Sequence, residues 1–129
     1  LHVIMHGRRR DEKIDPEKKE ALLRKAKQYK ELASTVLDMR ARKLYTEDAF
    51  RATAKILSLA PEFYTLWNYR REILQHMEAS GEQMAPKFEG ELKLLEAAIA
   101  QDPKAYSLWS HRMWVLERFK SPEHVQREL

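Results

Sequence analysis

The sequence contains no cysteine, which excludes a disulfide framework, a zinc ribbon and a thiol nucleophile within the chain. Only three glycines and five prolines occur in 129 residues, so the frequent tight turns of an all-β domain are not expected. No apolar run approaches the ~18 residues that a membrane-spanning helix needs. Residues 1–5 are apolar except for His2 and too few for a signal peptide, and the run of three arginines follows them instead of preceding them. We therefore expect a soluble, cytoplasmic protein without a membrane span.

Positive charge is concentrated near the start of the sequence. The formal net charge is +4. Residues 1–30 contain ten Lys and Arg against five Asp and Glu, whereas residues 31–129 contain fourteen against fifteen. A basic arm over residues 1–14 suits nucleic acid, acidic lipid or an acidic partner. Acidic residues alternate with the basic ones, and no aromatic platform for stacking on bases accompanies them. We therefore interpret the arm as solvated and expect no nucleic-acid partner.

A ten-residue segment of the chain recurs 42 residues later. Residues 61–70 read PEFYTLWNYR and residues 103–112 read PKAYSLWSHR. Five residue types stand in register in the two copies: Pro61 and Pro103, Tyr64 and Tyr106, Leu66 and Leu108, Trp67 and Trp109, and Arg70 and Arg112. Rare residues that keep one spacing twice indicate an internal structural repeat.

Each copy of the segment lies between two helical patterns. Before the second proline, apolar residues are spaced by four, three and four, at Phe88, Leu92, Leu95 and Ile99, which predicts one face of a helix. The corresponding face before the first proline has Thr53 as its weak, polar member. Proline lacks an N–H group and fixes φ, so each proline marks the point where one helix ends and another begins. The repeating unit is therefore helix, short turn and helix.

These patterns predict an all-α helical-repeat domain over residues 15–129. Its expected parts are a long first helix over 15–43, one repeat over 46–80, a second repeat over 86–120, and the start of a further helix over 121–129. The expected inner stripe of the long helix is Leu22, Ala26, Tyr29, Ala33 and Val36. Asp15 and Thr46 are the expected helix caps, and Ser80 with Gly81 is expected to end the second helix of the first repeat.

Helix pairs of this kind cannot bury their apolar faces alone and must stack. We expect antiparallel pairs that form a right-handed α-α superhelix, a solenoid like that of tetratricopeptide arrays. The period of 42 residues is longer than the tetratricopeptide period of about 34. The apolar face of the last repeat would be exposed unless further chain or a partner covers it.

The spacing Pro-x5-Trp-x2-Arg, found at residues 61–70 and 103–112, resembles the repeat of protein prenyltransferase α subunits. Within that family, the sequence Met5-His6-Gly7-Arg8 ahead of a long helix is similar to the beginning of Rab geranylgeranyltransferase α subunits. The resemblance covers essentially residues 5–129. It implies the α-subunit part of a heterodimeric enzyme that attaches geranylgeranyl to C-terminal cysteines of Rab GTPases. This part alone is not expected to be active.

The same resemblance implies partners and a reaction site. The expected partners are a prenyltransferase β subunit, a Rab GTPase with Rab escort protein, and geranylgeranyl diphosphate. Zinc is expected on the β subunit and no cofactor on this chain. In this family the Pro-Lys-x-Tyr segment of an early repeat faces the β subunit, which implies that Lys104 and Tyr106 contact the diphosphate. The first repeat has Glu62 at the lysine position, so only the second copy qualifies.

Other residues of the repeat have structural interpretations. We expect Trp67 and Trp109 in the packed core, and Arg70 and Arg112 paired with acids or carbonyls of the adjacent repeat. His111 is expected to be a hydrogen-bonded interface residue. The family often has two histidines here, and Ser110 occupies the first position.

Apart from His2 and His6 on the basic arm, no two of the five histidines are spaced i, i+4, and no zinc site is predicted in the chain. His6, on the basic arm, is a weak candidate for reaching a metal on a partner. Two other functions remain open at this point. One is a non-catalytic helical-repeat adaptor that binds a protein partner. The other is an RNA- or lipid-binding module that uses the arginine run.

Overall fold

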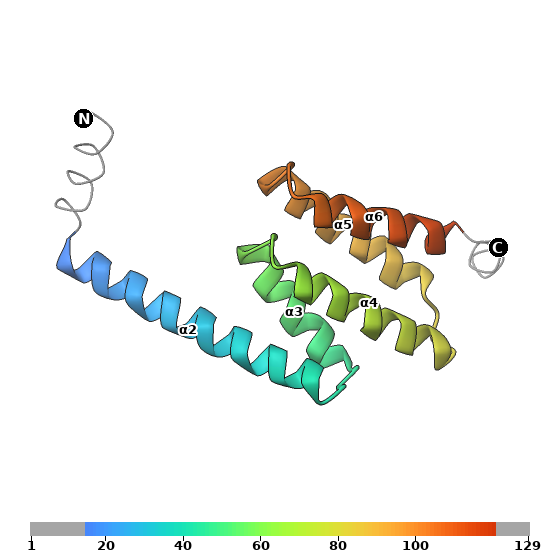
Figure 1. Cartoon of the computed structure of the whole chain (residues 1–129), viewed down its shortest axis with the longest axis horizontal. Coiled ribbons are helices and arrows are strands. Elements are labelled where there is room, and N and C mark those ends of the chain that lie inside the picture. The colour runs from blue at the N-terminus through green and yellow to red at the C-terminus, as the bar shows by residue number, and fades with distance from the viewer. Residues whose placement is uncertain (1–14, 121–129) are drawn as a thin grey trace. The chain divides into compact units, whose positions relative to one another are not determined.

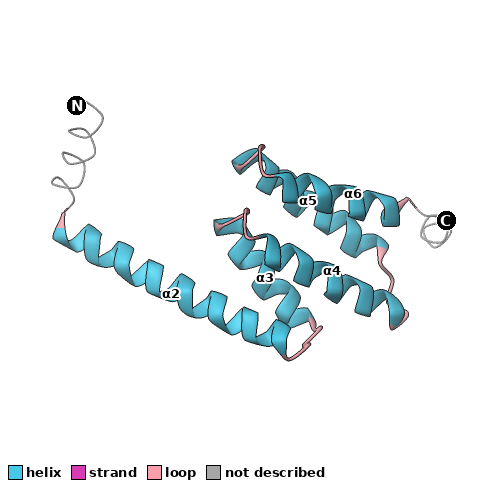
Figure 2. Ribbon diagram, in the orientation of Figure 1, coloured by secondary structure: helices cyan, strands magenta, loops and turns pink. Residues whose placement is uncertain are grey.

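The computed structural model describes residues 15–120. Within that range the chain forms five helices, α2 (Pro16–Ala41), α3 (Glu47–Leu59), α4 (Tyr64–Ala79), α5 (Ala85–Gln101) and α6 (Tyr106–Phe119). Between residues 15 and 120 there are helices and connecting loops without a strand (Figure 2). The prediction of an all-α class is confirmed. The basic arm over 1–14 and the further helix over 121–129 lie outside the described residues.

Helix α2 begins as its sequence indicates. The Asp15 carboxylate accepts a hydrogen bond from the Glu17 backbone N–H at 3.3 Å, and Pro16 is the first helical residue. The expected inner stripe was wrong over the first half of the helix. Leu22 is 57% exposed and Ala26 is exposed, whereas Val36 is fully buried. Apolar spacing identifies one side of a helix, but it does not identify whether another element covers that side.

The chain falls into two units that meet inside α2, between Ser34 and Thr35. The first unit contains most of α2, and its exposed Leu22 lies beside Lys18 and Lys25. The second unit contains the end of α2 and all of α3 to α6. The buried core residues and both copies of the repeated segment lie in this second unit.

Helices α3 and α4 form one antiparallel pair, and α5 and α6 form the next (Figure 1). The side chain of Thr46 caps α3, because its Oγ1 accepts a hydrogen bond from the Ala49 N–H at 3.1 Å. Ser80 ends α4, and Gly81 follows with φ of +83°, a conformation that glycine adopts without steric cost. Both caps were expected from the sequence.

The two pairs stack so that α3 lies against α5 and α4 against α6 (Figure 1). Large side chains from all four helices fill the space between them. The largest fully buried apolar side chains of α3 to α6 are Trp67, Tyr69, Phe88, Ile56, Leu57, Leu66, Ile73, Leu74, Leu95 and Leu108. None of the helices between residues 16 and 119 is long and apolar enough to span a membrane.

The buried face of α5 differs from the expected one. Phe88 and Leu95 are fully buried, but Glu91 and Ala98 complete that face, while Leu92 and Ile99 are half-buried. The buried residues are spaced by three, four and three, so this face is rotated from the predicted one. The rotation places a carboxylate inside the contact between the two repeats. It also leaves Leu92 and Ile99 on the outer side of the second pair.

Candidate functional site

The tryptophan of each repeat closes the turn that precedes it. The indole N–H of Trp67 donates a hydrogen bond to the backbone carbonyl of Pro61 at 2.8 Å, and that of Trp109 donates to the carbonyl of Pro103 at 2.8 Å. A proline carbonyl at a turn has no helical partner, so this bond satisfies it. The spacing Pro-x5-Trp is therefore the spacing of one hydrogen bond that fixes the turn to its second helix.

Arg70 joins the two repeats. Its guanidinium donates to both carboxylate oxygens of Glu91 at 2.6 and 2.9 Å, and it is only 3% exposed. It also donates to the Phe50 carbonyl at 2.6 Å and to Thr53 Oγ1 at 2.8 Å. The Phe50 ring lies 3.7 Å from the guanidinium carbon. Every direction of the fork has a partner, as a buried guanidinium requires.

Arg70 explains why the buried faces of α3 and α5 each contain a polar residue. Thr53 interrupts the apolar face of α3 because its hydroxyl accepts from Arg70 and donates to the Phe50 carbonyl at 2.7 Å. Glu91 was missed by the sequence reasoning. Its position three residues after Phe88 and four before Leu95 was the available signal, since it places an acid on a buried face.

His111 completes this buried cluster. Its Nε2 lies 2.8 Å from Glu91 Oε2, and Arg71 Nε donates to its Nδ1 at 3.1 Å. Because Nδ1 accepts a hydrogen bond, the ring proton is on Nε2 and points to Glu91. The ring is fully buried between Trp67 and Trp114, with centroids at 4.9 and 5.8 Å. The structure thus places His111 in the contact between the repeats.

The charges of the cluster favour an ionised Glu91 and a neutral His111. Burial raises the pKa of Glu91, but the Arg70 charge and the hydrogen bonds from His111 and Arg70 outweigh it and hold the pKa at about 2. Burial lowers the pKa of His111, and the hydrogen bond to Glu91 opposes this only in part. The buried contact therefore contains the ion pair of Glu91 with Arg70 and a neutral His111, to which the Arg71 guanidinium donates. This arrangement suits a structural lock better than a proton-transfer site.

The second copy of the signature differs from the first in its surroundings. Trp109 is 45% exposed and Arg112 is exposed, whereas Trp67 is 1% and Arg70 3% exposed. The expectation of a core position for Trp109 was therefore wrong for the described residues. Trp67 is covered by His111 of the following repeat. Within residues 15–120, Arg112 forms no ion pair equivalent to that of Arg70 with Glu91.

Lys104 and Tyr106 lie at the turn that connects α5 and α6. Both side chains are exposed, and Tyr106, the first residue of α6, is 83% exposed. The equivalent turn between α3 and α4 presents Glu62 and the 61% exposed Tyr64. The two turns lie at the same end of the stacked pairs (Figure 1). A tyrosine from each repeat and one lysine are thus presented along one edge, away from the Arg70 cluster.

Among residues 15–120, no three His, Asp or Glu side chains gather in a way that would hold a metal ion. His6 lies outside the described residues. His111 has both ring nitrogens engaged by protein side chains.

Comparison with known proteins identifies the repeat. Residues 46–77 and 88–119 each match the family described as protein prenyltransferase alpha subunit repeat. The chain belongs to this prenyltransferase α-subunit repeat family. Its match segments begin at or near the start of α3 and α5 and end in α4 and α6, so each contains one helical pair. The prediction made from Pro-x5-Trp-x2-Arg is confirmed.

Similar proteins carry one name in several organisms. Over 130 residues the chain is 36% identical to the geranylgeranyl transferase type-2 subunit alpha of Rattus norvegicus, covering 97% of the chain and 23% of the rat protein. The same-named protein of Saccharomyces cerevisiae is 37% identical over 103 residues, 78% of the chain and 31% of the yeast protein. An Arabidopsis thaliana subunit alpha 1 is 36% identical over 118 residues, 88% of the chain and 17% of that protein. The chain therefore spans less than a third of these relatives.

Proposed function

We propose that this chain is part of the α subunit of a heterodimeric protein geranylgeranyltransferase that acts on Rab GTPases. The two prenyltransferase α-subunit repeats and the shared name of the relatives support this assignment. The proposed partners are a prenyltransferase β subunit, a Rab GTPase presented by Rab escort protein, and geranylgeranyl diphosphate. The cytoplasm is the proposed location.

In the proposed reaction, the thiolate of a Rab C-terminal cysteine attacks C1 of geranylgeranyl diphosphate. The C1–S bond forms, the C1–O bond breaks, the thiol proton is lost to solvent, and diphosphate departs. Zinc bound by the β subunit would keep the cysteine as a thiolate near neutral pH. The part of this chain is to neutralise charge on the departing diphosphate, and Lys104 is the proposed source of that charge.

The proposed diphosphate contact is supported by the exposure of Lys104 and Tyr106 at the start of α6. A helix N-terminus presents backbone N–H groups and the positive end of the helix dipole, which favour an anion. The lysine adds a full positive charge and the phenol adds an O–H donor. The equivalent turn of the first repeat has Glu62 in place of the lysine, and a carboxylate repels a diphosphate. The two turns thus form a natural pair of test and control.

The assembly is tested first, by co-expressing the natural full-length protein with a Rab-type prenyltransferase β subunit. We expect a stable heterodimer and zinc-dependent transfer of geranylgeranyl to a Rab C-terminus in the presence of Rab escort protein. If the full-length protein folds but binds no prenyltransferase β subunit, the enzyme assignment is wrong and the helical-repeat adaptor becomes the better reading.

The site is tested by replacing Lys104 with alanine and Tyr106 with phenylalanine in that heterodimer. Loss of one group that stabilises transition-state charge should reduce kcat by roughly tenfold to a hundredfold for Lys104→Ala, with a smaller reduction for Tyr106→Phe. Single-turnover transfer is the measurement. Glu62→Ala and Tyr64→Phe are the matched controls and should leave kcat within about twofold. Unchanged turnover in Lys104→Ala would remove that residue from the site.

A further inference from the structure

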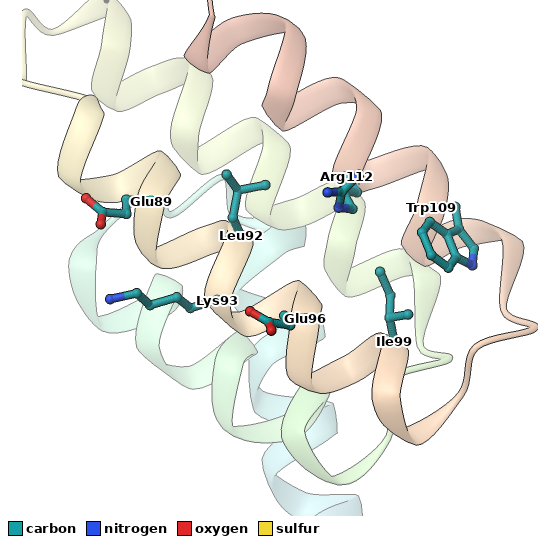
Figure 3. A pocket seen from close by; sticks show the side chains of 7 residues that line it. All are labelled: Glu89, Leu92, Lys93, Glu96, Ile99, Trp109 and Arg112. Atoms are coloured by element: carbon teal, nitrogen blue, oxygen red, sulfur yellow. The ribbon is translucent and has the colours of Figure 1, made fainter.

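The turn that carries Lys104 is held at both of its ends. At the α5 end, the side-chain amide of Gln101 donates a hydrogen bond to the Ser58 carbonyl at 3.2 Å, which ties the last residue of α5 to the first repeat. At the α6 end, the indole N–H of Trp109 donates to the Pro103 carbonyl at 2.8 Å. In Figure 3 the nitrogen of the Trp109 ring is directed toward the loop that joins α5 to α6. The residues between the two helices are thus fixed from both sides.

The bond from Trp109 acts on the peptide group that directly precedes Lys104. The Pro103 carbonyl and the Lys104 N–H belong to one planar peptide group. A hydrogen bond that fixes the direction of this carbonyl therefore also fixes the direction of the Lys104 N–H and the position of the Lys104 Cα. The lysine side chain starts from that Cα, so the Trp109 bond limits the region that the ammonium group can reach.

The turn of the first repeat has the same indole bond but a different residue at the tether. The Trp67 indole donates to the Pro61 carbonyl at 2.8 Å, as in the second repeat. The position of Gln101 is occupied by Leu59, which is 67% exposed and has no side-chain donor. The turn that presents a lysine therefore has a side-chain tether that the turn with Glu62 cannot form.

Placement matters for Lys104 because charge on a departing diphosphate develops only as the transition state forms. A cation that is already in position stabilises this charge without reorganising first. A displacement of about 1 Å can remove much of such an effect. Trp109 is 45% exposed, and a hydrogen bond at such a position adds little to folding stability. Removing the bond should therefore alter the position of the lysine more than it alters the fold.

We propose that Trp109 is a positioning residue for Lys104, because its indole N–H fixes the turn from which the lysine reaches the departing diphosphate. Trp109 acts through Lys104, while Gln101 holds the opposite end of the turn. This inference rests on the proposed function, since it concerns the diphosphate contact that is assigned there to Lys104.

The test removes only the indole N–H, by the change Trp109→3-benzothienylalanine in the full-length protein assembled with its β subunit. This analogue retains two fused rings and has sulfur in place of the N–H group. The single-turnover rate constant of geranylgeranyl transfer should fall roughly threefold to tenfold, while KM for the Rab protein stays within about twofold. Trp67→3-benzothienylalanine removes the same bond from the turn without a lysine. It is the matched control and should leave the rate constant within about twofold.

Combination with Lys104→Ala separates positioning from other effects. If Trp109 acts through Lys104, the benzothienylalanine change should have no further effect in the Lys104→Ala background. Rate losses that multiply, an equal loss in the Trp67 control, or an unchanged rate with the Trp109 analogue would each overturn the inference and leave the proposed function intact. If Lys104→Ala itself leaves the transfer rate unchanged in an active heterodimer, the diphosphate role of Lys104 is wrong and the role of Trp109 fails with it.

Discussion

The two copies of the Pro-x5-Trp-x2-Arg segment have nearly the same sequence and very different surroundings. In both copies the tryptophan N–H donates to the proline carbonyl at 2.8 Å. Trp67 and Arg70 are buried, whereas Trp109 and Arg112 are exposed. The hydrogen bond comes from residues inside one repeat, so it forms in both. Burial comes from the next repeat, so it differs. The repeated sequence therefore specifies the turn, and the neighbouring repeat specifies the environment.

The largest expected effect is on the ion pair that distinguishes the first repeat from the second. Glu91→Gln removes the charge that compensates Arg70, which is 3% exposed. An uncompensated buried guanidinium should lower the free energy of unfolding by about 3–5 kcal/mol. Urea unfolding followed by circular dichroism is the measurement.

Two further variants test whether the effect of Glu91→Gln comes from the buried charge of Arg70. Glu72→Gln breaks a partly exposed pair with Arg40 at 2.9 Å and should cost less than about 1 kcal/mol. The double variant Arg70→Met with Glu91→Leu should cost less than Glu91→Gln alone, because no charge then remains buried. If Glu91→Gln and Glu72→Gln have equal effects, the Arg70 cluster is not the lock between the repeats.

A somewhat smaller effect is expected from acid. The pKa of Glu91 is about 2 in the folded chain, below its ordinary value of 4.5, so its contribution is present above pH 4.5 and lost as pH falls toward 2. This corresponds to about 3 kcal/mol. The pKa of His111 is lowered from 6.5, so the unfolded chain binds the proton more readily and stability falls as pH drops below about 6.5.

Unfolding free energies between pH 7 and pH 3 separate these two contributions. The Glu91→Gln variant should lack the part of the decline below pH 4.5. The His111→Asn variant should lack the part that begins near pH 6.5. Declines that match that of the unaltered chain in both variants would show that other groups determine its acid sensitivity.

The smallest expected effects are those of replacing each of the two tryptophans by phenylalanine. Trp67→Phe removes a buried hydrogen bond to Pro61 and part of a ring that His111 covers. It should lower the free energy of unfolding by about 2 kcal/mol. Trp109→Phe removes the same bond at an exposed position, and it should cost at most about 0.5 kcal/mol in the 129-residue chain. Equal costs would mean that the turn bond matters more than burial.

Much of the fold was predictable because its signals are local. The recurrence at an offset of 42, the prolines between helices, and the caps at Asp15, Thr46 and Gly81 depend on residues close together in the sequence. The candidate diphosphate residues Lys104 and Tyr106 came from a short motif, and the structure places both on the surface at one turn. Their role remains a prediction.

The wrong predictions concern burial, which depends on residues that are distant in the sequence. The apolar spacing of α2 predicted burial at Leu22, which is exposed, because spacing carries no information on what covers a helix. The same limit applies to α5, which has two overlapping candidate faces. Both include Phe88 and Leu95, but the face that is buried continues through Glu91 and not through Leu92. An isolated acid among leucines does not reveal its partner, since Arg70 is 21 residues away in the sequence.

The sequence by itself determined the helical pairs, their turns and the family to which they belong, because hydrogen bonds within one repeat and the 42-residue recurrence are written in neighbouring residues. The tertiary structure alone decided which copy of the signature is buried and which carboxylate holds Arg70. It also decided that His111 is a neutral donor between two tryptophans. These properties depend on the stacking of one pair on another, which brings together side chains that no local pattern connects.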